Sequence, residues 1–235
     1  MHITEGFLPA VHCAAWYAVS APFVIHGARV VVRETRKSPE NTLLLGAAGA
    51  FTFVLSAIKL PSITGSSSHP TGTGLGAVLF RPPVMAFLGT VVLLFQALLL
   101  AHGGITTLGA NVFSMAIVGP WTGYGAWRLV QRLRLPWWVG AFAAMAVADL
   151  STYCVTSLEL ALAYPDQGTG IAGAAAKFLG LFAVTQVPLA VVEGLLGIVV
   201  LRFLGRVAPE DMTRMGLGVL SSAPADDSRE TADVH

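Results

Sequence analysis

The feature that most constrains this chain is a series of apolar, nearly uncharged runs. The clear ones are Pro9 to Val32, Thr42 to Leu60, Pro83 to Ala101, Leu108 to Trp127, Pro136 to Leu158, and Ile171 to Leu201. About 20 mostly apolar residues in a helix cross the hydrocarbon core of a bilayer. Only 11% of the residues are charged, where soluble domains average roughly 25%. The runs therefore predict an all-α, polytopic membrane helix bundle.

Lysine and arginine gather after alternate runs, and this asymmetry predicts the orientation. They are Arg29, Arg33, Arg36 and Lys37 after the first run, Arg128, Arg132 and Arg134 after the fourth, and Arg202 and Arg206 after the last. Because basic segments stay in the cytoplasm, the N-terminus is expected outside and the C-terminus inside. That requires an odd number of crossings. Adding the short apolar piece Gly72 to Phe80 makes seven transmembrane helices.

Two regions are expected along the chain. Residues 1–206 form the transmembrane domain, and residues 207–235 form a polar cytoplasmic tail, disordered from about residue 221. Met1 to Pro9 lacks the basic residues of a secretory signal, so the mature chain is expected to begin at Met1. A net charge of +1 provides no basic field for a nucleic-acid partner.

The first two residues form a predicted metal chelate. The α-amine of Met1, the backbone nitrogen of His2 and the imidazole of His2 can reach one ion together and close fused rings. Planar nitrogen sites suit Cu(II) and Ni(II), with Co(II) a relative, whereas Mg²⁺ prefers oxygen. The alternative is that His2 is an exposed residue without a ligand role.

His69 is the natural fourth nitrogen ligand. It lies in a stretch rich in glycine, serine and threonine, from Ser62 to Gly74, between apolar segments. Irregular backbone at membrane depth is tolerated where it lines a cavity or packs on protein, and interrupted segments are typical of transport sites. The sequence therefore predicts a metal site of Met1, His2 and His69, with an ordinary interfacial loop as the alternative for His69.

Several other ionisable residues have open roles. Glu5 orients His2, neutralises the charge of the site or is simply exposed, and His102 is expected to cap a helix or gate the site. Asp149 and Glu193 lie within apolar runs, where ionisable groups are costly and functional by default. Each is either an ion relay or a structural group that forms an interhelical hydrogen bond or contacts a partner subunit.

Two motifs are absent from the sequence, and their absence limits the possible functions of the protein. There is no phosphate-binding glycine loop of the Walker A type and no HExxH metalloprotease motif. The chain is therefore predicted not to be an enzyme, and uphill transport would need partner subunits or an ion gradient. The alternatives are a transporter or channel that works alone, driven by a coupled ion, and an intramembrane metalloenzyme.

Three separated blocks of the sequence form a distinctive set. They are Met1 to Pro9 (MHITEGFLP), Ser66 to Pro82 (SSSHPTGTGLGAVLFRP) and Gln96 to Pro120 (QALLLAHGGITTLGANVFSMAIVGP). Together they resemble the CbiM/NikM family, the substrate-capture components of energy-coupling-factor transporters for cobalt and nickel. The blocks occur in the family's order, and the resemblance extends to about Arg206. The Glu5-to-Pro9 stretch is closer to the cobalt branch.

The resemblance implies a seven-helix fold whose N-terminus enters the bundle. It implies metal ligation by Met1, His2 and His69, with Co²⁺ (or Ni²⁺) as cargo and no resident cofactor. It also implies partners: a CbiQ-like transmembrane subunit, a CbiO-like ATPase and a small CbiN-like membrane subunit. The expected location is the cytoplasmic membrane of a prokaryote.

Overall fold

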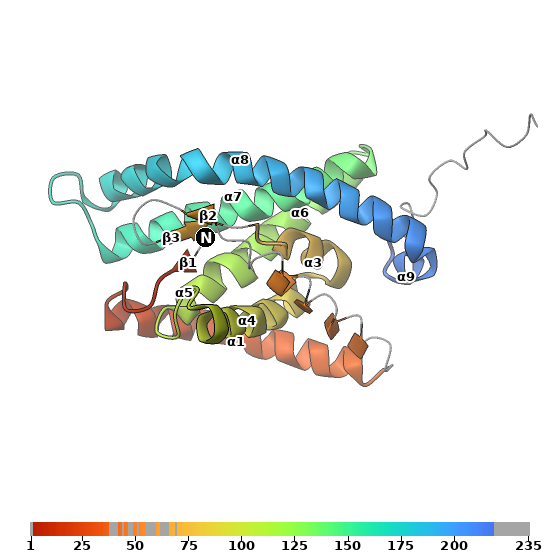
Figure 1. The fold of residues 1–235 in the computed structure, drawn as a ribbon, viewed down its shortest axis with the longest axis horizontal. Coiled ribbons are helices and arrows are strands. Elements are labelled where there is room, and N and C mark those ends of the chain that lie inside the picture. Colours follow the sequence, from red (N-terminus) through yellow and green to blue (C-terminus); the bar gives the residue numbers. More distant parts are fainter. Residues whose placement is uncertain are drawn as a thin grey trace, which may run out of the picture.

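The described part of the chain is mostly helical. A computed structural model describes residues 2–37, 42–43, 45–46, 49–50, 52–54, 60–61, 66–68 and 70–218. Its long helices are α1 (Ala10–Thr35), α4 (Pro82–Leu100), α7 (Trp137–Ala163) and α8 (Gly170–Val207). Helices α7 and α8 lie side by side along the long axis of the molecule, and α1 runs along the opposite side (Figure 1).

These four helices are long and apolar enough to cross a membrane, within the part of the chain that the structure describes. A further run is continuous helix from Leu108 to Arg132, in three parts: α5 (Leu108–Asn111), the π-helix η1 (Val112–Val118) and α6 (Gly119–Arg132). The short piece predicted as a crossing is α3 (Thr73–Phe80). The prediction of a polytopic helical membrane protein is confirmed, and the number of seven crossings stays a prediction.

Some predicted boundaries were wrong. Helix α7 continues five residues past Leu158, to Ala163, because Glu159 is buried in the bundle and does not end the helix. Among residues 42–54 of the predicted second span, those described have helical backbone, but Leu60 lies in a strand.

A small sheet lies beside the N-terminus, which the all-α prediction did not include. It consists of β1 (His2–Ile3), β2 (Leu60–Pro61) and β3 (Ser66–Ser68), in the order β1-β3-β2 with antiparallel pairing. Strands of two or three residues are too short to show the alternating pattern by which a strand is predicted. The sheet therefore depends on long-range pairing.

Small residues let the helices approach closely, as is common in membrane proteins. A Cβ atom built on Gly123 of α6 would lie 2.5 Å from the carbonyl oxygen of Ala144 in α7. One on Gly89 of α4 would lie 2.7 Å from the Cβ of Ala116 in η1. These contacts bring α6 against α7 and α4 against η1.

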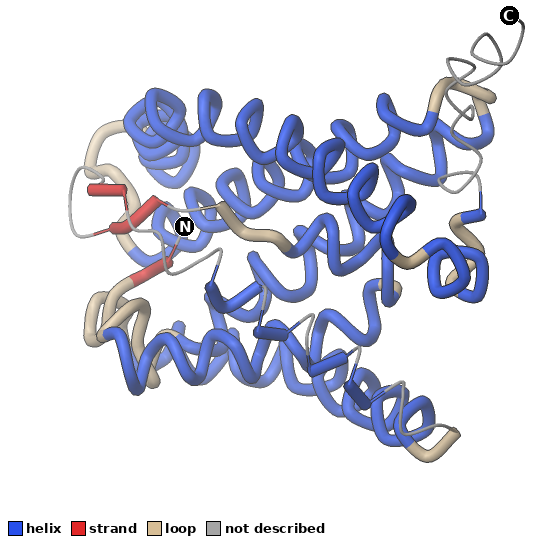
Figure 2. Tube along the Cα trace, turned by 45° about the vertical axis from the view of Figure 1, so that its right-hand side comes forward, coloured by secondary structure: helices blue, strands red, loops and turns tan. Residues whose placement is uncertain are grey.

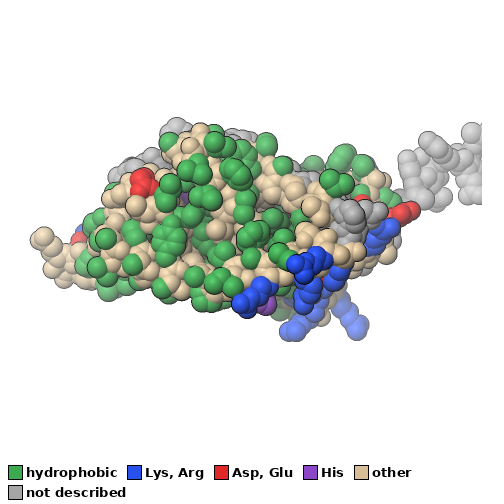
Figure 3. All heavy atoms as spheres, turned by 90° about the horizontal axis from the view of Figure 1, so that it is seen from below, with side chains coloured by type: hydrophobic (Ala, Val, Ile, Leu, Met, Phe, Trp, Pro, Cys, Tyr) green, Lys and Arg blue, Asp and Glu red, His purple; other side chains and the backbone are tan. Residues whose placement is uncertain are grey.

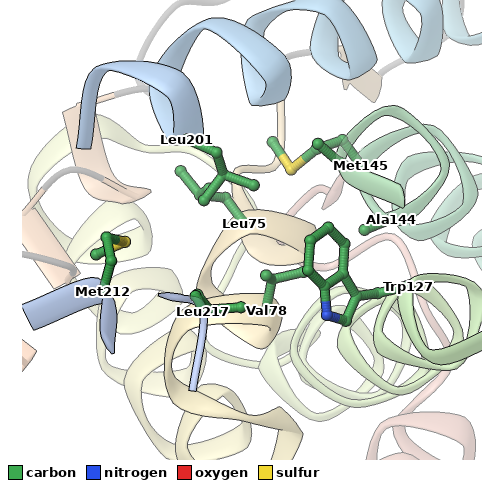
Figure 4. Packing of buried hydrophobic residues seen from close by; sticks show 9 residues of the cluster. Leu75, Val78, Trp127, Ala144, Met145, Leu201, Met212 and Leu217 are labelled. Carbon is green, nitrogen blue, oxygen red and sulfur yellow. The ribbon is translucent and has the colours of Figure 1, made fainter. Parts of the chain in front are cut away.

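Two clusters of buried side chains hold the two ends of the bundle. One lies between α3, α6, α7, α8 and α9 (Pro209–Arg214). Figure 4 shows its members Leu75, Val78, Trp127, Ala144, Met145, Leu201, Met212 and Leu217. Met212 and Leu217 belong to the start of the predicted tail, and residues after 218 lie outside the described part. The other cluster surrounds the N-terminal segment and contains Ile3, Leu8, Cys13, Ala110, Tyr153, Leu160 and Phe182.

The two ends of the molecule differ in charge. The strands lie at one end and α9 at the opposite end (Figure 2). The last turns of α1, α6 and α8 contain Arg33, Arg132 and Arg206. Lys and Arg side chains gather over one part of a face that is otherwise largely hydrophobic (Figure 3). Figure 1 places the ends of these three helices away from the N-terminal sheet.

Candidate metal centre

The N-terminal segment is inside the protein. The His2 side chain is 1% exposed and that of Ile3 is 3% exposed. Strand β1 pairs with β3, with His2 opposite Ser67 and Ile3 opposite Ser66. The second residue of the chain is therefore held in a fixed register beside the strand that precedes His69.

Asn111, the last residue of α5, holds the backbone of Ile3. The Ile3 N–H donates to Asn111 Oδ1 at 2.7 Å, and Asn111 Nδ2 donates to the Ile3 carbonyl at 3.0 Å. The Asn111 side chain is itself 1% exposed. A buried backbone group left without a bond is costly, so this pair of bonds fixes the position of the residue next to His2.

The loop from Ala101 to Thr107 holds the same segment from another side. The Thr107 hydroxyl donates to the Ile3 carbonyl at 2.8 Å, and the Gly6 N–H donates to Thr106 Oγ1 at 3.2 Å. The Thr106 N–H donates to the Glu5 carboxylate at 3.1 Å. Hydrogen bonds from Thr106, first from its side chain and then from its backbone, lower the pKa of Glu5. Glu5 therefore stabilises the N-terminal segment as a carboxylate.

Two glycines in this loop make room for the N-terminal segment. Gly103 has a positive φ of 77°, which side chains rarely adopt, and a Cβ there would lie 3.1 Å from Asn111 Nδ2 and 3.5 Å from His2 Cδ2. A Cβ on Gly104 would lie 2.5 Å from the Cα of Glu5. The loop backbone thus lies so close to the N-terminal segment that only glycine fits at these two positions.

His102 packs directly against His2. The two ring centroids are 4.3 Å apart with an interplanar angle of 77°, an edge-to-face arrangement. His102 is 2% exposed and follows the end of α4, where its N–H donates to the Gln96 carbonyl. The sequence predicted that His102 either caps a helix or gates the site. The structure adds a contact with the predicted ligand His2.

Of the three predicted ligands, only His2 is described. Met1 and His69 lie outside the described residues. No three His, Cys, Asp or Glu side chains form a metal-binding group within the ranges that the structure covers. Sites built from His12, His26, His102 and the buried carboxylates alone are therefore not supported by the described residues.

Glu193 of α8 holds the backbone that follows His69 in the sequence. Its carboxylate accepts the Thr71 N–H at 2.8 Å, the Thr71 hydroxyl at 2.7 Å and the Gly72 N–H at 2.8 Å. Glu193 and Thr71 are both 0% exposed. The structure therefore gives Glu193 a hydrogen-bonding role toward the loop before α3, and the ion-relay alternative stays a prediction.

Two other carboxyl groups are buried in α7. Asp149 is 1% and Glu159 is 0% exposed, and neither group has a hydrogen-bond partner among the residues that are described. The sequence predicted an unusual environment for Asp149 but missed Glu159, because the expected helix ended at Leu158. Asn111 was also missed, although a polar residue inside an apolar run is a signal that could have identified it.

Comparisons with known proteins agree on one family. Residues 2–211 match the CbiM family, described as "Cobalt uptake substrate-specific transmembrane region". The chain is 66% identical over 217 residues to the "Cobalt transport protein CbiM" of Streptomyces coelicolor, covering 92% of this chain and 94% of that protein. A protein of the same name from Propionibacterium freudenreichii is 64% identical over 219 residues, with 93% of each chain covered.

Solved structures are similar as well. The crystal structure of a transition metal transporter aligns with a TM-score of 0.70 and 26% identity, covering 95% of this chain and 100% of that one. A truncated transition metal transporter aligns with a TM-score of 0.69 and 28% identity, covering 87% of this chain and 98% of that one. The resemblance noted in the sequence is therefore confirmed: the chain belongs to the CbiM family of cobalt uptake proteins.

Proposed function

We propose that this chain is the substrate-capture component of an energy-coupling-factor transporter that takes up Co²⁺. In the proposed site, the Met1 amine, the backbone nitrogen and imidazole of His2, and the imidazole of His69 bind the ion in a plane. The observation that carries the proposal is the burial of His2 beside an Ile3 backbone whose N–H and carbonyl are both bonded. An exposed residue at position 2 would not need such a cradle.

The segments on either side of the proposed ligands are anchored by different helices. Asn111 bonds the residue after His2, and Glu193 bonds the second and third residues after His69. Ligands held by their surroundings lose little freedom on binding, and such support strongly affects metal affinity. These two anchors support a site assembled from two distant segments of the chain.

The proposed donor set fits a transition metal. Amine and imidazole nitrogens bind Co²⁺, Ni²⁺ and Cu²⁺ well, whereas Mg²⁺ and Ca²⁺ prefer oxygen. Cobalt is proposed over nickel because the similar proteins cited above are named cobalt transport proteins. The ion is cargo, and the family is a transporter component and not an enzyme family.

The topology and partners are part of the same proposal. The chain would cross the cytoplasmic membrane of a prokaryote seven times, with the N-terminal site outside and the arginine-rich helix ends inside. Because the sequence contains no phosphate-binding loop, uphill uptake would need a CbiO-like ATPase, joined through a CbiQ-like subunit and assisted by a CbiN-like one. A chain that works alone would have to use Asp149 as its ion relay, since Glu193 already accepts three hydrogen bonds.

Cobalt binding to the purified chain tests the proposal. We expect His2→Ala and His69→Ala to weaken binding by more than about 100-fold, because support residues alone change affinity by about 10–100-fold. His26→Ala is the matched control, since His26 is an exposed histidine in the same membrane domain. Calorimetric titration of all four proteins, each with intact mass determined, measures this. Wild-type affinity in His69→Ala would overturn the four-nitrogen site.

A further inference from the structure

A cavity lined by basic residues lies at the end of α1 that is remote from the N-terminal segment. It has a volume of about 750 Å³ and lies between the second half of α1 and the junction of α3 with α4. Its polar lining includes His26, Arg29, Arg33 and Arg81. We propose that this cavity binds the phosphate headgroup of an anionic phospholipid.

Close packing between α1 and α4 forms one boundary of the cavity. A Cβ atom on Gly27 would overlap the carbonyl oxygen of Pro83, so the two helices touch there. His26 and Arg29 flank this contact point on α1, and Arg81 precedes α4 on the other side. Arg29 of α1 and Arg81, which precedes α4, therefore line the same cavity although they come from different elements.

Arg81 has an unusual backbone for a residue with a side chain. Its φ of 72° and ψ of 153° fall in a region that is almost restricted to glycine. Glycine would adopt this conformation without strain, and strained residues are concentrated at binding sites. The arginine side chain at this position is therefore better explained by a ligand in the cavity than by the needs of the turn.

Among the described residues that line the cavity, the charges do not cancel. Their acidic member, Glu34, receives two bonds from Lys37 Nζ at 2.8 and 2.9 Å and lies 3.8 Å from Arg33. Arg29 and Arg81 form no ion pair within the described residues. Guanidinium groups bind phosphate with two parallel hydrogen bonds, so these two arginines suit a phosphate anion.

The surroundings favour a lipid over a free anion. Val30, Leu79, Phe80 and Val84 also line the cavity, and they would contact the first part of an acyl chain. The cavity lies in the arginine-rich part of a membrane protein, where basic pockets between helices bind lipid headgroups. A free inorganic anion would gain nothing from this apolar wall beside the arginines.

Lipid binding to the purified full chain tests the inference. Native mass spectrometry would compare retention of phosphatidylglycerol with that of phosphatidylcholine by the wild type and by the double variant R29Q/R81Q. The matched control is R128Q/R132Q, which removes two exposed arginines of α6 that are not part of the lining. We expect R29Q/R81Q to lose roughly 10- to 30-fold in phosphatidylglycerol affinity, as two arginines near an anionic surface suggest. The control should keep the wild-type value.

A second variant separates binding from folding. R81G removes the side chain and also relieves the backbone strain at position 81. It should therefore unfold at no lower temperature than R81Q and yet lose affinity for phosphatidylglycerol. Equal losses in the cavity and control variants would overturn the inference in favour of a general basic surface. Complete displacement of the lipid by millimolar inorganic phosphate would overturn the lipid as the ligand. Unchanged lipid retention in R29Q/R81Q, with loss of assembly with partner subunits, would identify a protein interface instead.

Discussion

The side-chain amide of Asn111 bonds both the N–H and the carbonyl of Ile3, at 2.7 and 3.0 Å. Within this arrangement the amide acts like the backbone of a neighbouring strand, and β3 occupies the other side of β1. A two-residue strand cannot hold its own position. Asn111, together with Thr106 and Thr107, therefore fixes how far the N-terminus reaches into the protein.

Replacing Asn111 with Ala should weaken cobalt binding about 10–100-fold, the range typical of residues that support metal ligands. It should also destabilise the protein by about 1–3 kcal/mol, because the buried Ile3 N–H loses its acceptor. Calorimetric titration with Co²⁺ and thermal unfolding would measure the two effects. Ser114→Ala is the control, since the Ser114 hydroxyl donates only to carbonyls of its own helical run. Equal cobalt affinity in the two variants would contradict the anchoring role.

Replacing Glu193 with Ala should release the Thr71–Gly72 backbone and weaken cobalt binding through His69. Two buried N–H groups lose their acceptor in this variant, and each such loss costs about 1–3 kcal/mol. Glu193→Gln keeps one acceptor oxygen and should lie between the wild type and Glu193→Ala in both affinity and melting temperature. If Glu193→Ala binds cobalt like the exposed control Glu210→Ala, Glu193 does not position the site.

The contribution of Glu5 should depend on pH. Its folded-state pKa is lowered, so the ionised carboxylate stabilises the docked N-terminus above the ordinary carboxyl pKa of about 4.3. That stabilisation is lost as the pH falls through the folded-state pKa. Glu5→Gln should therefore melt below the wild type at neutral pH by a small margin, because exposed charges contribute about 1 kcal/mol or less. The difference should shrink in acid, and a difference that grows in acid would refute this role.

Adding one residue before Met1 should abolish tight cobalt binding. The extension converts the proposed amine ligand into an amide nitrogen, which is a poor donor, and it lengthens a segment whose register is held at Ile3. We expect a loss of more than about 100-fold, beyond the range for support residues. The same residue added after His235 is the control. The measurement is cobalt titration of both proteins with uncleaved termini verified by mass, and equal affinities would remove the amine from the site.

The sequence by itself determined the class of protein and which residues to consider as ligands. Apolar runs near the length of a bilayer crossing identified α1, α4, α7 and α8, because span length and hydropathy are local properties. Three short blocks identified the family, which the comparisons confirm. His2 was selected as a candidate ligand from its neighbour Met1, and its ligand role stays a proposal.

Only the tertiary structure decided what surrounds those residues. Asn111 lies 108 positions from Ile3, and Glu193 lies 122 positions from Thr71, so no local pattern links them. The paired strands are too short to show a periodicity, and Glu159 was missed because the predicted span ended at Leu158. In each case the packing of distant helices determines which polar groups are buried together. Because buried polar groups are generally hydrogen-bonded, their partners depend on the tertiary fold and not on the neighbouring sequence.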